Sequence, residues 1–166
     1  MPSAAPLCFD SGGEEIASAI VDALASTIIA AHDALVDQRG FNPKAKLPED
    51  ETAERVKAAI CASFCTYFGS QPSDRFTDVF DQVAHFASNF ARDHIFLDGN
   101  KRTTMVMSFA ILRIPGFTIG GTDSYIPEYN EAYRWIQDVV TNECTEEELA
   151  AYLRNNYLPV NRRNAP

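Results

Sequence analysis

The apolar positions of this chain recur at helical spacing over most of its length. After a short loose start, one helical stripe is formed by Ile16, Ile20, Leu24, Ile28 and Ala31. Ser11 and Glu14 precede the stripe with the spacing of a capping box, so a long first helix ending near Gly40 is predicted. A second helix is predicted from Glu51 to Phe68, because Gly69-Ser-Gln-Pro-Ser73 interrupts the chain there.

The middle of the chain carries the strongest helical patterns. A third helix is indicated by a series at i, i+3, i+4 and i+7: Phe76, Val79, Phe80, Val83, Phe86, Ala87, Phe90 and Ala91. From Asn100 to Arg113 the residues are apolar or small nearly all the way round, which predicts a central helix surrounded by others. Pro115-Gly116 ends that helix, and Phe117-Thr-Ile119 is at most a short extended piece.

Two further helices are expected near the end of the chain. They cover about Pro127–Asn142 and then Thr145–Asn156, where Thr145 and Glu148 form a second capping box. The fold predicted from these patterns is an all-α bundle of about six helices around a central helix. With 166 residues, of which 46% are hydrophobic, the chain can close one core. We expect one domain over residues 13–158, a loose N-terminus over 1–12 and a tail over 159–166.

The charge of the chain argues against several functional classes. Its net charge is −9 and its isoelectric point is near 4.7. Such a surface repels phosphate backbones, and no basic patch offsets it, so we expect neither direct nucleic-acid binding nor binding to anionic membranes. The start of the chain has no charged and apolar regions of a signal peptide, and no stretch approaches the roughly 18 apolar residues of a membrane span. A cytoplasmic protein is therefore expected.

The four cysteines suggest reduced thiols. They stand at positions 8, 61, 65 and 144, without a CxxC motif or the spacing of a disulfide framework. Cys61 and Cys65 share one face of the second predicted helix, and with His85 and His94 they offer the residue types of a zinc site. Small apolar core residues are the better interpretation of the two thiols.

Chemically reactive side chains are concentrated between the third and fourth predicted helices. The segment reads His94-Ile-Phe-Leu-Asp98-Gly99-Asn100-Lys101-Arg102. If the central helix begins at about Asn100, the backbone N–H groups of Gly99, Asn100 and Lys101 are unpaired donors at the positive end of its dipole. Phosphate is the natural guest of such a helix terminus.

Each side chain of this segment has a plausible part in phosphate chemistry. Gly99 lets the backbone turn and approach an anion, and Lys101 and Arg102 add cationic donors. Asp98 can hold Mg²⁺ on phosphate oxygens, and His94 can take a proton from an attacking hydroxyl. Phe96 is expected to anchor the segment in the core. Taken singly these residues are ordinary caps, a solvated helix turn and a satisfied histidine, but together they favour phosphoryl-type transfer.

The same segment resembles the signature of a known family. Fic proteins carry His-x-Phe-x-Asp/Glu-Gly-Asn-x-Arg, and the Doc type carries His-x-Phe-x-Asp-x-Asn-Lys-Arg. The chain is similar to the Doc type at all six specified positions, which are His94, Phe96, Asp98, Asn100, Lys101 and Arg102. A second segment, Ala31 to Gly40 with His32-Asp33, resembles the first helix of Doc proteins. The resemblance spans roughly Ala25 to Tyr157.

The resemblance implies a fold, a set of roles and two co-reactants. It implies a Fic/Doc-like helical bundle in which His94 is the general base and Asp98 the Mg²⁺ ligand. Asn100, Lys101 and Arg102 would bind the phosphates of ATP, the co-substrate. A loop or β-hairpin flap, mapped to about Phe41 to Asp50, would dock the target protein by backbone pairing. The docking residues of this flap would be Lys44, Ala45, Lys46 and Leu47.

Departures from the Fic pattern bear on which group is transferred. Most adenylylating Fic proteins have Pro, Gly and Arg where this chain has Ile95, Lys101 and Met105. Doc-type members with this Lys are understood to transfer the γ-phosphate of ATP, with translation elongation factor Tu as the target class. Gly99, where Doc commonly has Ala, keeps adenylyl transfer as the alternative.

Regulation and the remaining alternatives also follow from the comparison of motifs. Ser11 to Glu15 and Ser124 to Glu128 have the spacing of a Fic inhibitory motif, but the residues after them do not fit it. Inhibition by a separate antitoxin chain is therefore expected of this Doc-like toxin. A catalytically silent nucleotide-binding module is a further alternative. A metal-centred hydrolase is weaker, because His94 and Asp98 alone are too few ligands for a catalytic zinc site.

Overall fold

The computed structural model describes residues 3–37, 49–119 and 129–159. Within these residues the chain forms seven helices and two short strands, which confirms the all-α prediction. The elements in chain order are α1 (Glu14–Asp37), α2 (Glu49–Phe64), α3 (Pro72–Arg75), α4 (Val79–Arg92), α5 (Asn100–Arg113), β1 (Phe117–Ile119), α6 (Glu131–Thr141), α7 (Glu146–Asn156) and β2 (Tyr157–Pro159).

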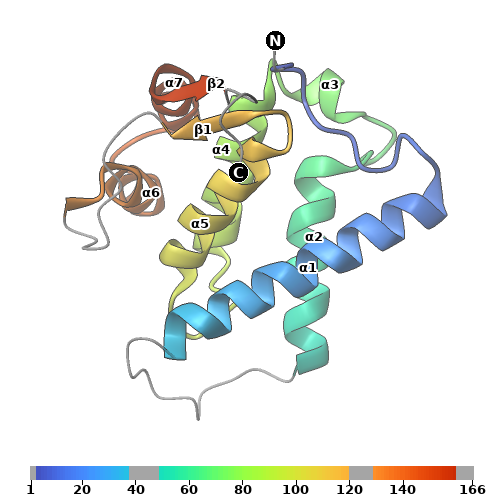
Figure 1. Ribbon diagram of the computed structural model, residues 1–166, viewed down its shortest axis with the longest axis horizontal. Helices are drawn as coiled ribbons and strands as arrows, with labels where there is room; N and C mark the ends of the chain where they lie inside the picture. The colour runs from blue at the N-terminus through green and yellow to red at the C-terminus, as the bar shows by residue number, and fades with distance from the viewer. Residues whose placement is uncertain (1–2, 38–48, 120–128, 160–166) are drawn as a thin grey trace, which may run out of the picture.

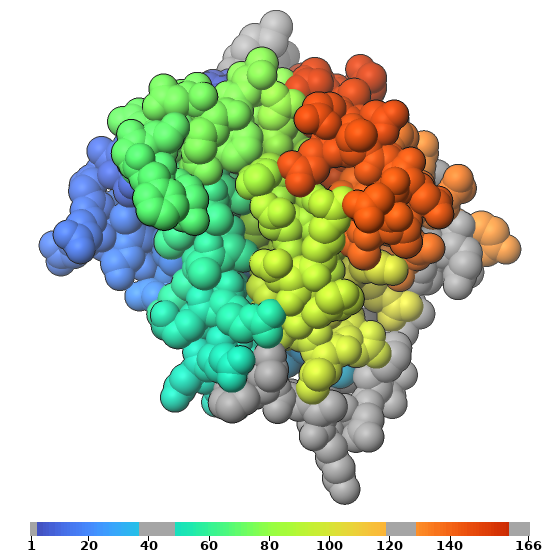
Figure 2. Space-filling view, turned by 180° about the vertical axis from the view of Figure 1, so that it is seen from behind, coloured from blue at the N-terminus to red at the C-terminus, as the bar shows by residue number. Residues whose placement is uncertain are grey.

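The centre of the bundle is shared by α4 and α5. Figure 1 shows α1 running diagonally across α2, with its C-terminal end beside the first turn of α5. From behind, α4 lies between α2 and α7 (Figure 2). α4 packs against α2, α5, α6 and α7, and α5, the helix expected from its composition to be central, packs against α1, α4, α6 and β1.

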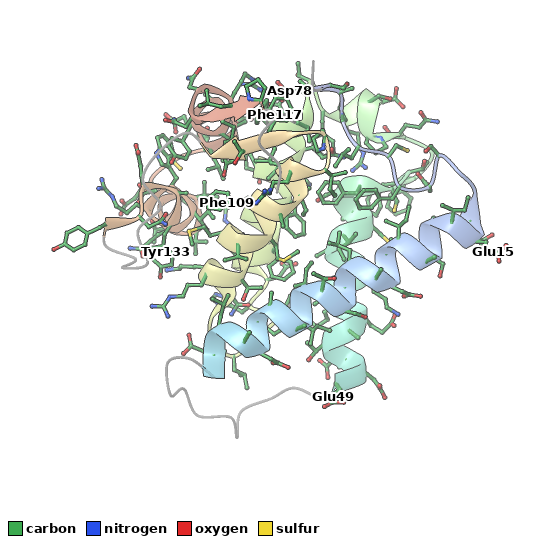
Figure 3. The ribbon with its side chains drawn as sticks, in the orientation of Figure 1. Glu15, Glu49, Asp78, Phe109, Phe117 and Tyr133 are labelled. Carbon is green, nitrogen blue, oxygen red and sulfur yellow. The ribbon has the colours of Figure 1, made fainter. Side chains whose placement is uncertain are left out.

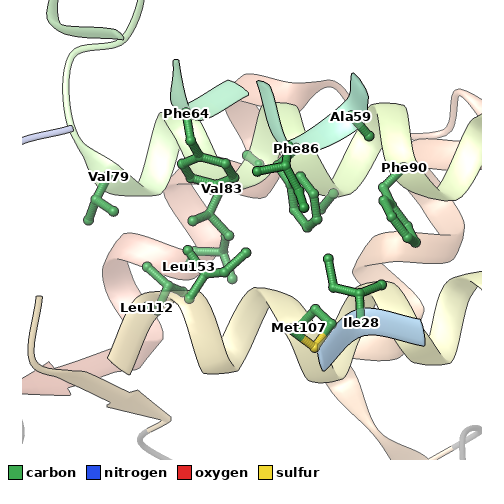
Figure 4. Close-up of a cluster of buried hydrophobic side chains, with 14 of the residues drawn as sticks. Ile28, Ala59, Phe64, Val79, Val83, Phe86, Phe90, Met107, Leu112 and Leu153 are labelled. Carbon is green, nitrogen blue, oxygen red and sulfur yellow. The ribbon is translucent and has the colours of Figure 1, made fainter. Parts of the chain in front are cut away.

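Aromatic side chains dominate the core between α2, α4 and α5. Phe64, Phe86 and Phe90 are fully buried, and the ring of Phe86 lies 5.5 Å from that of Phe64 and 5.3 Å from that of Phe90 (Figure 4). Burial of each such ring contributes about 1.5–3 kcal/mol relative to leaving it exposed. Met107 and Leu112 close the core from α5. This core fixes the relation of α4 to α5, and therefore the loop that joins them.

Residues 3–12, which were expected to be loose, are bound to the bundle by hydrogen bonds and packing. Phe9 is buried, its ring stacks on Phe64, and its backbone N–H donates to the carbonyl of Phe64 over 2.8 Å. The buried side chain of Gln82 bonds both backbone groups of Leu7. The Ser11 hydroxyl donates to the carbonyl of Cys8, so Ser11 does not form the expected capping box.

Two helix boundaries differ from those predicted, for local reasons. The second helix ends at Phe64 because a tight turn follows, in which Tyr67 and Ser70 exchange backbone hydrogen bonds. Phe68 and Gly69 both have positive φ angles, 48° and 79°, as a two-residue hairpin turn of type I′ requires. The next long helix begins only at Val79, because the side chain of Asp78 accepts from the N–H groups of Phe80 and Asp81 and caps α4.

The end of the chain adds a small sheet to the helices. β1 and β2 pair antiparallel, with Phe117 opposite Pro159, and this second strand was not predicted. The capping box of Thr145 and Glu148 at the start of α7 is confirmed. α6 begins at Glu131 with Asn130 as its cap. The predicted start at Pro127 lies outside the described residues.

The first helix has the length and hydropathy of a membrane span, contrary to the expectation from sequence. The segment Glu14–Val36 reaches a mean hydropathy of 1.6 in an 18-residue window. In the structure α1 packs on α2 and α5 through a buried face formed by Val21, Ala25, Ile28 and His32. A helix that covers a protein core can have this composition as well, so length and composition alone do not separate the two roles.

Candidate functional site

The candidate site is built on the loop that joins α4 to α5. Arg55 of α2 donates to the carbonyl of Asp93 over 2.7 Å and holds the end of α4. Ile95 and Phe96 are then buried beneath the loop. His94 is exposed and has a left-handed backbone with φ 46°. The two buried side chains anchor the loop, and the left-handed residue before them turns the imidazole toward the surface.

Asn100 closes the loop onto itself. Its Oδ1 accepts from the N–H of Phe96 over 2.9 Å, and its Nδ2 donates to the carbonyl of Phe96 over 2.6 Å. The side chain is buried, and both polar ends are used by these two bonds. The sequence placed Asn100 among the phosphate-binding groups. In this geometry only its backbone N–H is available to a phosphate, because the amide side chain shapes the loop.

The first turn of α5 presents open backbone donors. Gly99 is the residue before the helix and has φ 77°, in the left-handed region that favours glycine. The helical ladder starts with the N–H of Thr103, which donates to the carbonyl of Gly99 over 2.9 Å. The N–H groups of Asn100, Lys101 and Arg102 therefore have no acceptor within the helix. They stand at the positive end of a 14-residue helix dipole, where an anion is stabilised.

A pocket of about 290 Å³ opens over this turn. His94, Asp98, Gly99, Lys101 and Arg102 all line it, so the structure brings the sequence-predicted side chains together. Lys101 and Arg102 are half-buried, and neither makes a hydrogen bond or ion pair within the described part of the chain. Two adjacent cations without a carboxylate partner are notable in a chain of net charge −9. The pocket is chemically suited to a polyanion.

Asp98 is the carboxylate of this pocket. It is exposed, and its Oδ1 accepts from the N–H of Gly99 over 2.6 Å. Its other oxygen has no protein donor among the described residues, which fits an Mg²⁺ ion that takes one carboxylate together with phosphate oxygens. No group of three or more His, Cys, Asp or Glu side chains able to hold a metal ion by themselves occurs in the described ranges. The donor set thus suits a metal that arrives with a phosphate ligand.

The pocket is also lined by three residues that were not predicted from the sequence, Ala91, Leu97 and Tyr133. Tyr133 comes from the first turn of α6 and is labelled in Figure 3. The side chain of Asn130 caps α6 by accepting from the N–H of Tyr133 over 3.0 Å. Tyr133 meets the loop only because α6 packs on α5, and nothing in the local pattern of its segment signals that contact.

The other sequence-predicted residues lie elsewhere. Cys65 is buried in the core, where burial raises the pKa of its thiol to about 12, and Cys61 packs against the same core. His85 pairs with Glu146 of α7 at 3.0 Å, so it does not join Cys61, Cys65 and His94 in a zinc site. The proposed docking residues Lys44, Ala45, Lys46 and Leu47 lie outside the described residues.

Comparison with known proteins identifies the family. A sequence model of the Fic/DOC family matches residues 22–112, more than half of the 166-residue chain. The chain belongs to the Fic/DOC family. The matched residues run from the middle of α1 to the end of α5 and include both His32 and the loop from His94 to Arg102. The family resemblance inferred from the loop motif is therefore confirmed.

A curated relative supports the same family. The chain is 27% identical over 98 residues to a protein named Toxin Doc from Mycolicibacterium smegmatis (strain ATCC 700084 / mc(2)155). The match covers 59% of this chain and 70% of that protein. Fic/DOC proteins are typically enzymes that transfer groups from nucleotides.

Proposed function

We propose that this protein is a Doc-like toxin that transfers the γ-phosphate of ATP to a hydroxyl group of a target protein. One observation carries the proposal: Lys101 and Arg102 face a pocket at the open N-terminus of α5 without a carboxylate partner in the described structure. Three open backbone donors and two free cations suit a triphosphate chain better than a single small anion.

The transfer step uses the residues of the loop in distinct roles. The target's hydroxyl oxygen attacks the γ-phosphorus, and a new oxygen–phosphorus bond forms as the bond to the β-bridging oxygen breaks. ADP leaves, and the imidazole of His94 takes the hydroxyl proton. Lys101, Arg102 and the first-turn N–H groups stabilise the charge on the phosphate oxygens. Mg²⁺, when bound by Asp98 and phosphate oxygens, would neutralise part of that charge.

The proposed biological setting is that of a toxin. The relative's name, Toxin Doc, and the six Doc-type positions of the loop support a toxin. We propose that this toxin works in the cytoplasm and that a separate antitoxin chain holds it in check. A translation factor such as elongation factor Tu is the proposed target class. Residues 44–47 are the proposed docking segment for that target.

Adenylyl transfer is the second candidate, and Gly99 is the residue that favours it. The structure offers a local reason for this glycine. Gly99 has φ 77°, and a Cβ added to it would lie 3.4 Å from Cδ2 of His32 and 3.5 Å from Cγ2 of Val36. Both distances are ordinary van der Waals contacts, so glycine at this position is explained by its left-handed backbone alone, without reference to the transferred group. That weakens the case for adenylyl transfer.

The decisive experiment labels the two candidate groups separately. The protein, Mg²⁺ and a cell extract are incubated with ATP carrying the label on either the γ- or the α-phosphate. We expect label on protein only from the γ position, and none with His94→Ala. His85→Ala is the matched control, because His85 of α4 pairs with Glu146 of α7 and does not line the pocket.

Each other outcome selects a different function. Label only from the α position would make the protein an adenylyl transferase and overturn the proposed chemistry. If wild type and His94→Ala label nothing and are equally harmless on expression, the pocket is a silent nucleotide-binding module. Both results would leave the family assignment intact.

A further inference from the structure

His32 joins α1 to the active-site loop. It is separated from Asp98 by 66 residues in sequence, and its Nε2 lies 2.9 Å from the carbonyl oxygen of Asp98. Its ring stacks on Phe96, with centroids 3.7 Å apart and planes only 8° from parallel. Its Cδ2 is also the atom nearest to a Cβ built on Gly99. One buried side chain therefore touches three successive parts of the loop.

The bond to Asp98 fixes the hydrogen on the ring and the direction of a peptide. A carbonyl oxygen can only accept, so Nε2 carries a hydrogen and donates it to Asp98. The other ring nitrogen, Nδ1, lies 3.1 Å from Oδ1 of Asp33. The peptide between Asp98 and Gly99 is held at both ends, because the N–H of Gly99 donates to Oδ1 of Asp98 over 2.6 Å. This peptide is the last one before the open donors of α5.

The Asp98–Gly99 peptide needs contacts that hold its orientation, because it precedes a glycine. A peptide that precedes glycine can rotate with little steric resistance, because glycine populates positive and negative φ about equally. Rotation would exchange the directions of the carbonyl oxygen and the N–H. It would turn a partial negative charge away from His32, and it would disturb the carboxylate of Asp98 on the same residue.

We propose that His32 is a positioning residue that holds the Asp98–Gly99 peptide in the orientation that keeps the phosphate pocket open. The consequence for turnover rests on the proposed transferase function, whereas the effect on loop geometry does not. His32 does not line the phosphate pocket, so it acts through Asp98 and Gly99. It lines a different cavity, of about 380 Å³, together with Phe96 and Leu97.

If His32 has only a structural role, the stacking of its ring on Phe96 is what counts. If it is a positioning residue, the hydrogen bond from its Nε2–H to Asp98 is what counts. Two variants separate these roles. His32→Phe keeps an aromatic ring for Phe96 and removes the donor. His32→Gln removes the ring and keeps an N–H donor at about the reach of Nε2. His32→Asn is the control for Gln, because its shorter amide stands near the Nδ1 position and does not reach Asp98.

The test measures kcat and KM for ATP in the transfer assay, together with hydrogen exchange at the amides of Phe96 and Gly99. Both amides are bonded within the loop, so their exchange reports its opening. For His32→Phe and His32→Asn we expect a loss of about tenfold in kcat and exchange about tenfold faster, the effect of one lost hydrogen bond. His32→Gln should recover most of both quantities. Urea unfolding identifies any variant that does not fold, and the Gln–Asn pair then decides.

The outcomes are separable from those of the proposed function. If His32→Phe matches wild type while His32→Gln is impaired in both readouts, the ring alone matters and the positioning role is wrong. Equal values for the Gln and Asn variants would also overturn it. If wild type transfers no group at all, the proposed function fails, yet the exchange rates still decide whether His32 holds the loop.

Discussion

The side chain of Asn100 spans the loop to Phe96 and bonds both of its backbone groups, at 2.9 Å to the N–H and 2.6 Å to the carbonyl. The first residue of α5 thereby fixes the residue that anchors the loop in the core. The conformation of the pocket and the stability of the fold depend on the same two bonds.

Asn100→Ala is expected to destabilise the fold by about 2–4 kcal/mol, because it leaves two buried backbone groups of Phe96 without partners. The free energy of unfolding in urea measures this loss. Asn156→Ala is the matched control, since Asn156 also donates to a carbonyl four residues earlier. Among the described residues its side chain makes only that one bond, and it is half-buried. This substitution should cost less than about 1 kcal/mol. Equal losses for the two variants would show that Asn100 does not hold the loop.

At position 94 the residue that best fits the backbone differs from the residue that transfer activity is expected to need. Its backbone is left-handed, with φ 46°, and its side chain is exposed. We expect His94→Gly to be more stable than His94→Ala by about 1 kcal/mol, because glycine adopts this conformation without strain. Both variants should lose transfer activity. Thermal or urea unfolding of the pair, beside the labelling assay, checks both statements. A more stable alanine variant would be incompatible with the left-handed backbone.

The helices that define the site could be predicted because their patterns are local. The periodic apolar face of α4 and the uninterrupted small and apolar residues of α5 placed the loop between two buried helices. Gly99 directly before a helix then predicted an anion site, since the geometry of a helix terminus depends only on the residues beside it. This local information was sufficient to place His94, Asp98, Lys101 and Arg102 around one pocket.

The remaining features depend on contacts between distant segments. The sequence predicted Asn100 as a phosphate ligand. In the fold its side-chain amide bonds the backbone of Phe96 instead, a contact that depends on the path of the loop. Tyr133 lines the pocket, and His32 contacts Asp98, only because α6 and α1 pack on α5. The turn at Tyr67–Ser70 was missed because Phe68 adopts a left-handed backbone that favours glycine, so only Gly69 signalled it. Sequence patterns of single elements contain none of these relations.

Lys101 is the residue on which the transferred group is expected to depend. Lys101→Ala should lower γ-phosphate transfer about 10- to 100-fold, the effect of a lost hydrogen bond from a charged donor. Lys101→Gly, which restores the residue of adenylylating Fic proteins, should raise the ratio of α to γ label. Initial rates with both labels measure these changes.

Lys57→Ala serves as the control for the loss of a lysine. Lys57 pairs with Asp22 and Glu54 on the surface and does not line the pocket. Its removal should leave transfer unchanged. If Lys57→Ala and Lys101→Ala have the same effect, Lys101 contributes only general charge.

The pair of Asp78 and Arg154 makes the stability of the bundle depend on pH. Asp78 caps α4 and accepts from Nε of Arg154 over 2.7 Å, which joins α4 to α7. Burial raises the pKa of this carboxyl, but hydrogen bonds from Arg154 and from the N–H of Asp81 outweigh it, so the pKa lies below its ordinary value of 3.8. Because the folded pKa is lowered, the stabilisation is present above the unfolded pKa and is lost as the pH falls through the folded one.

Asp78→Asn keeps a capping oxygen and removes the charge, whereas Asp78→Ala removes both. We expect the alanine variant to lose about 1–2 kcal/mol at pH 7, with the cap as the larger part, and the asparagine variant to lose less than about 1 kcal/mol. Below pH 4 the stability of the asparagine variant should fall less steeply with pH than that of wild type, because its amide does not titrate. Urea unfolding at pH 7, 5 and 3 measures these differences, with the exposed Glu143→Gln as control. An unchanged pH dependence in Asp78→Asn would show that this carboxylate does not link α4 to α7.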